Sequence, residues 1–196
     1  MKRRDVLKGL GLSLGYAVAT PTIISLLQSC KTDVVSWTPK FLSMDEGIVL
    51  KNLIDLILPE TFATPGALEV NVPEFLDVYF GKALDKESQK EYKDGILAIT
   101  DALLDSKDSS VSKLKTNDYD KILAKYLRAS KEDKENFSKK DKLIFEVLVE
   151  LRDTSVWAYR TSQKIGEEVL VYDPIPGAQL GCISVKEATG GKRWSL

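Results

Sequence analysis

The chain has 196 residues, of which 43% are hydrophobic. This length is sufficient for one domain with a hydrophobic core of its own and is too short for two stable domains. Residues 1–29 carry four basic side chains and one acidic side chain, so the net charge of −1 leaves the remaining 167 residues at −4. A mildly acidic chain of this kind offers no basic face, and we expect no nucleic-acid partner.

No histidine occurs anywhere in the sequence. Its absence excludes a Ser-His-Asp or Cys-His catalytic group, histidine-ligated zinc and a Cys-x-x-Cys-His haem attachment within this chain. It also removes the commonest general base near neutral pH.

The N-terminus has the pattern of a twin-arginine export signal. Arg3 and Arg4 are followed by a variable residue, two apolar residues and Lys8. Residues 9–27 are apolar but diluted by glycines, Pro21, serines and threonines, which favours a signal peptide over the alternative of a retained membrane helix. We therefore predict a signal peptide over residues 1–29. The twin-arginine translocase carries folded proteins, which often hold a cofactor or travel with a partner that does.

The signal ends in a sequence that is similar to a lipobox. Leu27 lies three residues before Cys30, and a small residue directly precedes that cysteine. We expect lipid on Cys30, a tether over residues 30–42 and a protein held on the periplasmic side of the membrane; ordinary signal cleavage nearby is the alternative. With Cys30 lipidated, Cys182 has no partner within the chain for a disulfide, and we expect it to be a buried, unreactive side chain.

The first half of the remaining chain predicts three helices. Ser43 and Glu46 have the spacing of a capping box, and the apolar residues that follow recur with helical periodicity until Pro59. A loop follows, and Asn71 is the expected N-cap of a second helix with an apolar stripe. The third helix is expected over residues 86–104. The stripe of the second helix consists of Phe75, Leu76, Tyr79 and Phe80.

The second half predicts two more helices. A short one includes residues 119–127, and the charged stretch 131–140 is expected to be a solvated turn. Ser138 and Asp141 can cap the fifth and longest helix, which continues to about Gly166. The sequence therefore predicts an all-α fold with an irregular C-terminal tail, and this tail could include a short strand pair. We expect one compact domain of about five helices over residues 43–196.

Carboxylates are plentiful, but none forms a persuasive catalytic pair. Asp45 with Glu46, and Glu167 with Glu168, are neighbours that point different ways on a helix. No phosphate-binding loop, ferredoxin spacing or cytochrome motif occurs. We expect no catalytic, cofactor-binding or metal-binding residue in this chain.

The tail combines stiff residues with exposed aromatic ones. Tyr172 precedes Pro174, Pro176 and Gly177, and Trp194 lies two residues from the end of the sequence. Prolines hold an extended backbone with little entropy left to lose. Such a segment can pack along its own helices or against another chain, and the sequence leaves both open.

Two blocks of sequence carry a family resemblance. The first runs from Ile57 to Thr61, then Thr64 to Ala67, then Val72 to Phe75, and the second from Thr154 through Trp157, Tyr159 and Leu170 to Gly177, then Gly181 and Cys182. Together they resemble the gluconate 2-dehydrogenase subunit 3 family over about residues 43–183. Phe62 stands where the family usually has aspartate, and residues 157–159 replace the more usual Gly-Tyr-Phe.

The resemblance implies a non-catalytic small subunit that carries the export signal for a large flavoprotein of the glucose–methanol–choline type. That flavoprotein binds FAD and oxidises a sugar or sugar acid, and some complexes add a cytochrome c subunit. Alternatives are a free-standing helical envelope lipoprotein that binds a small ligand or envelope component, and an enzyme in its own right. The residues expected to contact the partner are Thr64, Pro65, Gly66, Trp157, Tyr159, Tyr172, Pro174, Pro176 and Gly177.

Overall fold

The computed structural model describes residues 37–104, 110–175, 177 and 181–195. They belong to one compact unit, Val35–Leu196. The predicted export signal with Arg3 and Arg4, the predicted lipid site Cys30, and Pro176 lie outside the described residues. Within the described ranges, no helix is both long and apolar enough to cross a membrane.

Helices α2 (Met44–Ile57) and α3 (Val72–Lys82) begin where the sequence predicts. The hydroxyl of Ser43 accepts the Glu46 N–H at 3.3 Å, and the Glu46 carboxylate accepts the Ser43 N–H at 2.7 Å, so the capping box is confirmed. Asn71 is the N-cap of α3, but its side chain makes no capping hydrogen bond. Its backbone instead adopts a left-handed conformation (φ 55°), which asparagine tolerates better than most residues.

The remaining long helices are α4 (Lys86–Leu104), α5 (Thr116–Leu127) and α7 (Lys139–Thr161). The bounds of α4 agree with the prediction at both ends. Helix α7 is the longest described helix, with 23 residues, and its predicted cap is confirmed because the Ser138 hydroxyl accepts the Asp141 N–H at 3.1 Å.

Short helical segments lie between these long helices and after α7, and the expectation of about five helices counts only the long ones. The prediction of a turn over residues 131–140 is wrong in part, because α6 (Lys131–Glu135) forms there on a capping box of Ser130 and Asp133. The other short segments are η1 (Val111–Lys113), the π-turn η2 (Ile165–Val169) and α8 (Val185–Thr189).

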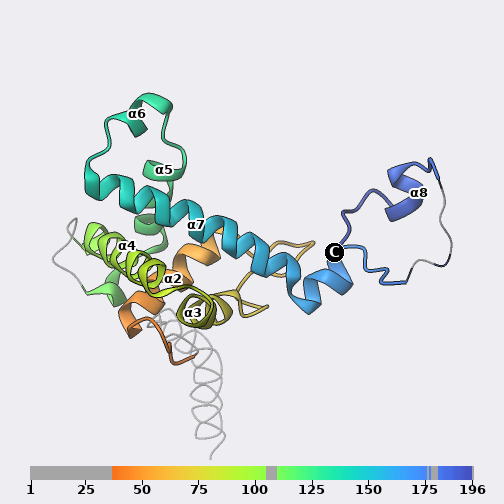
Figure 1. Cartoon of the computed structure of the whole chain (residues 1–196), viewed down its shortest axis with the longest axis horizontal. Helices are drawn as coiled ribbons and strands as arrows, with labels where there is room; N and C mark the ends of the chain where they lie inside the picture. The colour runs from red at the N-terminus through yellow and green to blue at the C-terminus, as the bar shows by residue number, and fades with distance from the viewer. Residues whose placement is uncertain (1–36, 105–109, 176, 178–180, 196) are drawn as a thin grey trace, which may run out of the picture. The chain divides into compact units, whose positions relative to one another are not determined.

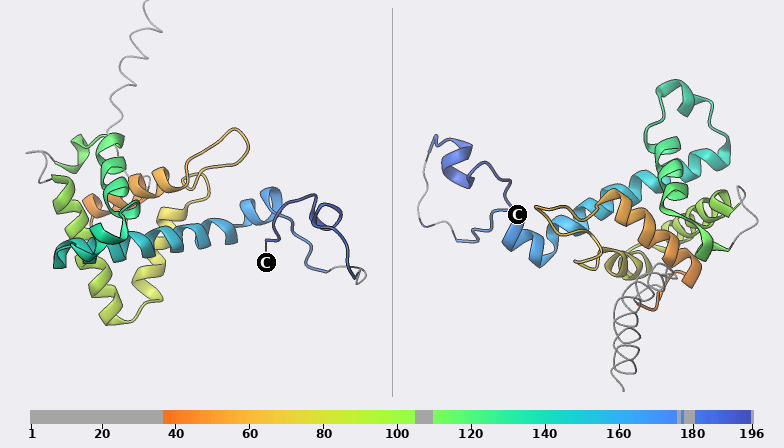
Figure 2. Two further views of the ribbon diagram at one scale, coloured as in Figure 1. Left: turned by 90° about the horizontal axis from the view of Figure 1, so that it is seen from above. Right: turned by 180° about the vertical axis from the view of Figure 1, so that it is seen from behind.

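Helix α7 packs against α2, α3, α4 and α5 (Figure 1), and Figure 2 shows this arrangement from two further sides. It contacts α4 at Gly95, where an added Cβ would meet the Val147 side chain at 2.3 Å. Only glycine leaves room for the two helices at this point.

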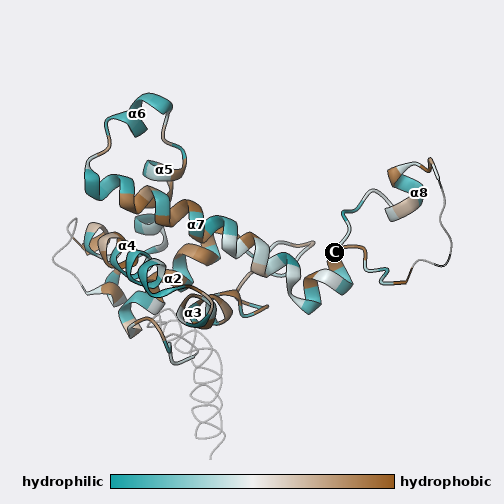
Figure 3. Cartoon of the chain, in the orientation of Figure 1, coloured by the Kyte–Doolittle hydropathy of each residue, from teal (hydrophilic) through white to brown (hydrophobic). Residues whose placement is uncertain are grey.

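The core is lined by the apolar faces that the helical periodicity predicts. Figure 3 shows hydrophobic and hydrophilic residues mixed along α4 and α7, whereas α6 is almost wholly hydrophilic. Large aromatic residues lie at the centre of the core, and the rings of Phe80 and Tyr92 stack with centroids 3.8 Å apart. The largest fully buried side chains are Tyr92, Tyr119, Tyr126 and Phe80.

The segment before α2 is attached to α3 by a buried carboxylate. Asp77 is fully buried and accepts backbone N–H groups from Lys40 at 2.6 Å, Phe41 at 3.2 Å and Leu42 at 2.9 Å. A buried carboxylate needs such donors to offset its lost hydration. The last residues of the predicted tether are therefore bound to the helical body.

The C-terminal tail closes into a loop. Val171 and Trp194 form a parallel bridge, with the Val171 N–H donating to the Arg193 carbonyl and the Ser195 N–H donating to the Val171 carbonyl, both at 3.0 Å. This isolated bridge stands in place of the strand pair that the sequence allowed, and the described ranges contain no β-strand. Trp194 is nevertheless 42% exposed, so closure of the loop does not bury it.

Candidate partner-binding surface

The loop between α2 and α3 is held by hydrogen bonds of its own. The Thr61 hydroxyl accepts the N–H groups of Ala63 and Thr64 at 3.2 and 3.0 Å and shares a hydrogen bond with the Thr64 hydroxyl at 2.8 Å. Phe62 lies at the tip of this turn and is fully exposed. The loop therefore presents an aromatic ring to solvent on an ordered backbone.

The base of the loop leaves no space for a larger residue at Gly66. An added Cβ there would lie 2.7 Å from the backbone nitrogen of Glu60. The Gly66 N–H donates to the Glu69 carboxylate at 3.1 Å, and the Ala67 N–H donates to the Leu58 carbonyl at 2.9 Å. These contacts explain why glycine occupies this position in the first sequence block.

Helix α7 is hydrogen-bonded to the loop between α2 and α3. The Tyr159 hydroxyl donates a 2.6 Å hydrogen bond to the Pro65 carbonyl oxygen. Four of the predicted contact residues are thus brought together, namely Thr64, Pro65, Gly66 and Tyr159. Tyr159 is half-buried, so its role in this structure is to position the loop rather than to project from the surface.

Beside this loop, α3 and α7 form an aromatic cluster of Phe75, Tyr79 and Trp157. The Trp157 ring lies 5.8 Å from that of Phe75 and 5.4 Å from that of Tyr79, and the two α3 rings are 5.9 Å apart. Phe75 and Trp157 are each 45% exposed. Two exposed rings that rest on the partly buried Tyr79 form an apolar surface suited to protein contact.

The sequence predicted Phe75 and Tyr79 in the apolar stripe of this helix, and Tyr79 does pack against the core, but the exposure of Phe75 was not predicted. The signal was present, because the apolar positions of α3 cover more of the helix than one buried face requires. Leu76 and Phe80 are fully buried, whereas Phe75 and Tyr79 lie one position earlier in each turn and remain partly exposed.

The predicted tail residues are exposed but belong to a separate place. Tyr172, Pro174 and Gly177 all face solvent. In the part of the chain that the structure describes, no hydrogen bond, ion pair or ring contact joins them to the loop or to the aromatic cluster.

The expectation that Cys182 is buried is wrong, because its side chain is exposed and its backbone has a positive φ of 56°. Its described neighbours Gly181 and Ile183 are exposed as well.

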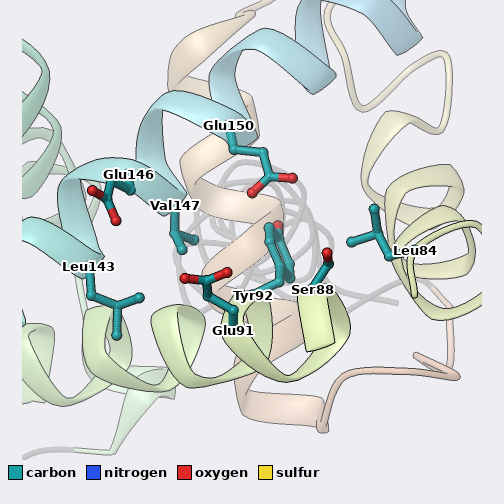
Figure 4. Close-up of a pocket in the computed structure, with 8 residues that line it drawn as sticks. All are labelled: Leu84, Ser88, Glu91, Tyr92, Leu143, Glu146, Val147 and Glu150. Atoms are coloured by element: carbon teal, nitrogen blue, oxygen red, sulfur yellow. The ribbon is translucent and has the colours of Figure 1, made fainter. Parts of the chain in front are cut away.

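The structure also brings together carboxylates that the sequence had not paired. Glu91 of α4 and Glu146 and Glu150 of α7 line a cavity of about 220 Å³ between the two helices (Figure 4). Partial burial raises the pKa of Glu150, and the charge of Glu91 raises it further. Burial also raises the pKa of Tyr92, which lines the cavity, well above 10, and its hydroxyl has no hydrogen-bond partner among the described residues.

This acidic cavity is small for a substrate site. Its volume is below the ~300–1,000 Å³ of typical ligand pockets. Among the described residues, no group of three or more His, Cys, Asp or Glu side chains is placed to hold a metal ion. The i, i+4 spacing of Glu146 and Glu150 was a usable sequence signal, but their approach to Glu91 depends on how α4 and α7 pack.

The family model of gluconate 2-dehydrogenase subunit 3 matches residues 44–177. The chain belongs to this family. The match begins at α2 and includes the loop, the aromatic cluster and the first part of the tail. Neither a curated protein nor a solved structure matches the chain. As a member of the gluconate 2-dehydrogenase subunit 3 family, the chain is an accessory subunit of a dehydrogenase complex.

Proposed function

We propose that this protein is the non-catalytic small subunit and export escort of an FAD-dependent sugar or sugar-acid dehydrogenase of the glucose–methanol–choline type. It carries the twin-arginine signal with Arg3 and Arg4, is lipid-anchored through Cys30 and resides on the periplasmic side of the membrane. A cytochrome c subunit completes the complex where electrons pass to the membrane. The observation that carries the proposal is the partly exposed aromatic cluster that contains Phe75 and Trp157, together with the fully exposed Phe62 on the ordered loop, in a chain of this family.

The energetics favour this surface as the subunit interface. Interfaces depend on a few aromatic or arginine anchors, and removal of a central one costs about 2 kcal/mol or more. The turn that carries Phe62 is already ordered by the Thr61 and Thr64 hydrogen bonds, so binding pays little entropy to order it. Phe75 and Trp157 are fixed by contact with each other and with Tyr79.

We assign FAD and the chemistry to the partner subunit. The FAD pyrophosphate usually rests on a glycine-rich turn between a strand and a helix. The described ranges hold no strand and therefore no such turn. Removal of hydride from a sugar hydroxyl also needs a base that works near neutral pH, and this chain has no histidine.

The test is co-expression of the flavoprotein with and without this chain, followed by co-purification and periplasmic dye-linked sugar oxidation. We expect each of three variants to lower the affinity for the flavoprotein about 30-fold or more, as loss of an anchor does, and so to reduce co-purification. They are Phe62→Ala, Phe75→Ala and Trp157→Ala. Lys131→Ala and Glu135→Ala on the solvated α6 are the matched controls and leave it unchanged. Equal oxidation without this chain, with nothing co-purifying, contradicts the proposal and favours a free-standing ligand-binding lipoprotein.

A further inference from the structure

A second cavity lies where the tail closes against the end of α7. It has a volume of about 520 Å³ and is lined by Arg160 of α7, by residues of α8 and by the closing segment that contains Trp194. The cavity is open to solvent, and its volume is within the ~300–1,000 Å³ of small-molecule sites. The cavity is distinct from the aromatic cluster and from the acidic cavity between α4 and α7.

The charged residues that line this cavity are all positive, namely Arg160, Lys192 and Arg193. Over the ranges that the structure describes, none of the three forms an ion pair, whereas Arg152 and Lys164 outside the cavity pair with Asp153 and Glu69. Three unpaired cations around one hollow raise the local concentration of anions.

Arg160 gives the more specific sign of a missing acceptor. Its Nε atom is buried and has no hydrogen-bond partner among the described residues. A buried donor without an acceptor costs about 1–3 kcal/mol, so native structures rarely retain one without a compensating ligand or water. A guanidinium is also the side chain best shaped to bind a carboxylate or phosphate.

The rest of the wall is apolar. Ile183, Val185 and Trp194 line the same cavity and are 43%, 68% and 42% exposed. Apolar side chains beside unpaired cations match a ligand with two parts, an oxyanion and a hydrocarbon or ring that covers the apolar wall.

We propose that this cavity binds a small soluble organic acid, in which an oxyanion is attached to an apolar body. The Arg160 guanidinium pairs with the oxyanion, Lys192 and Arg193 supply further positive charge, and Trp194 covers the apolar part. Because Arg160 belongs to α7 and Trp194 to the closing segment, the ligand fastens the tail to the helical body. The inference goes beyond the subunit role and does not depend on it.

The experiment is calorimetric titration of the full-length chain with three probes. Octanoate is expected to bind saturably at one site, inorganic phosphate more weakly because it lacks the apolar body, and octylammonium not at all. Added NaCl weakens octanoate binding by screening the cations. Ligand-induced change in tryptophan fluorescence is expected to disappear in Trp194→Phe and to persist in the control Trp157→Phe.

Arg160→Gln is expected to weaken octanoate binding about 10-fold or more, the value of one charge-assisted hydrogen bond. The matched control Arg152→Gln, whose guanidinium pairs with Asp153 outside the cavity, leaves the affinity unchanged. Lys192→Gln, at an exposed position, serves as a second variant and keeps the test decisive where Arg160→Gln fails to fold.

The proposal is overturned by the absence of saturable octanoate binding, by equal binding of octanoate and octylammonium, or by an affinity that neither Arg160→Gln nor Lys192→Gln changes. Binding to phosphatidylglycerol-containing vesicles without binding of octanoate also overturns it, because the cavity would then be part of a membrane-facing surface. A variant that loses octanoate binding but still co-purifies with the flavoprotein shows that this site is separate from the proposed subunit interface.

Discussion

The Tyr159 hydroxyl donates a 2.6 Å hydrogen bond to the Pro65 carbonyl oxygen, across 94 residues of sequence. This bond joins the two sequence blocks that carry the family resemblance at one point, because Pro65 belongs to the first and Tyr159 to the second. Loop and helix α7 therefore act as one unit, with Phe62 and Trp157 as its exposed aromatic side chains. A partner that binds this unit contacts residues from both blocks.

Tyr159→Phe removes this hydrogen bond and leaves the Pro65 carbonyl without its donor. The free energy of unfolding is expected to fall by about 1 kcal/mol, measured by urea denaturation. Because the loop loses its outer support, co-purification of the flavoprotein weakens as well. Tyr172→Phe, at an exposed tyrosine of the tail, is the matched control and changes neither quantity.

Gly66→Ala tests whether the base of the loop is as tightly packed as the structure indicates. The new Cβ would lie 2.7 Å from the Glu60 backbone nitrogen, so the loop must shift, at a cost of about 1–3 kcal/mol. Gly177→Ala places its Cβ in open space and is the control. Equal thermal stability of the two variants would show that the loop relaxes freely around position 66.

Asp77→Asn tests the attachment of residues 40–42 to α3. The amide retains one acceptor oxygen and turns a donor toward backbone N–H groups, so we expect a loss of about 3 kcal/mol in the free energy of unfolding. Asp55→Asn, at an exposed position of α2, leaves stability within about 0.5 kcal/mol of the wild type. Comparable losses in both variants would count against a specific role for Asp77.

Local signals in the sequence were sufficient to predict the long helices. The bounds of α4 and the caps at Ser43 and Ser138 follow from helical periodicity and short-range capping chemistry, and the structure confirms them. Helix α6 was missed because its charges suggested a solvated turn, although Ser130 and Asp133 have the same capping spacing as Ser138 and Asp141.

The candidate surface was only partly predictable, because it depends on contacts between distant segments. The sequence blocks indicated Pro65 and Tyr159 as contact residues, but no periodicity in the sequence reveals that Tyr159 donates a hydrogen bond to Pro65. The sequence placed Phe75 in an apolar stripe, but the exposure of part of its ring beside Trp157 depends on how α3 packs against α7. The exposure of Cys182 depends equally on how the tail closes.

Export and lipid attachment are predictions from the sequence alone. Replacement of Arg3 and Arg4 by lysine keeps the charge but removes the paired guanidinium groups of the twin-arginine pattern, and we expect the protein to remain in the cytoplasm on cell fractionation.

Cys30→Ala is expected to abolish labelling by a fatty-acid analogue and to release the exported protein from the membrane, because stable anchoring needs more than one acyl chain. Cys182→Ala is the control and retains the label.

Glu150→Gln addresses the acidic cavity between α4 and α7. Partial burial and the charge of Glu91 raise the pKa of Glu150 in the folded chain, so the folded state holds this proton more tightly than the unfolded state. The contribution of Glu150 to the free energy of unfolding therefore falls as the pH rises from about 4.5, the ordinary pKa of glutamate, through the raised pKa. At pH 7 the wild type bears this penalty in full, and Glu150→Gln is expected to be more stable.

The stability gained by Glu150→Gln is expected to shrink as pH is lowered through the raised pKa, as measured by urea denaturation from pH 7 to 4. Glu91→Gln is the matched variant, because removal of its charge lowers the pKa of Glu150 toward the ordinary value. The gain from Glu150→Gln is accordingly smaller in a Glu91→Gln background, which a double-mutant cycle measures. A gain that is independent of pH, or unaffected by Glu91→Gln, would mean that the two carboxylates do not interact across the cavity.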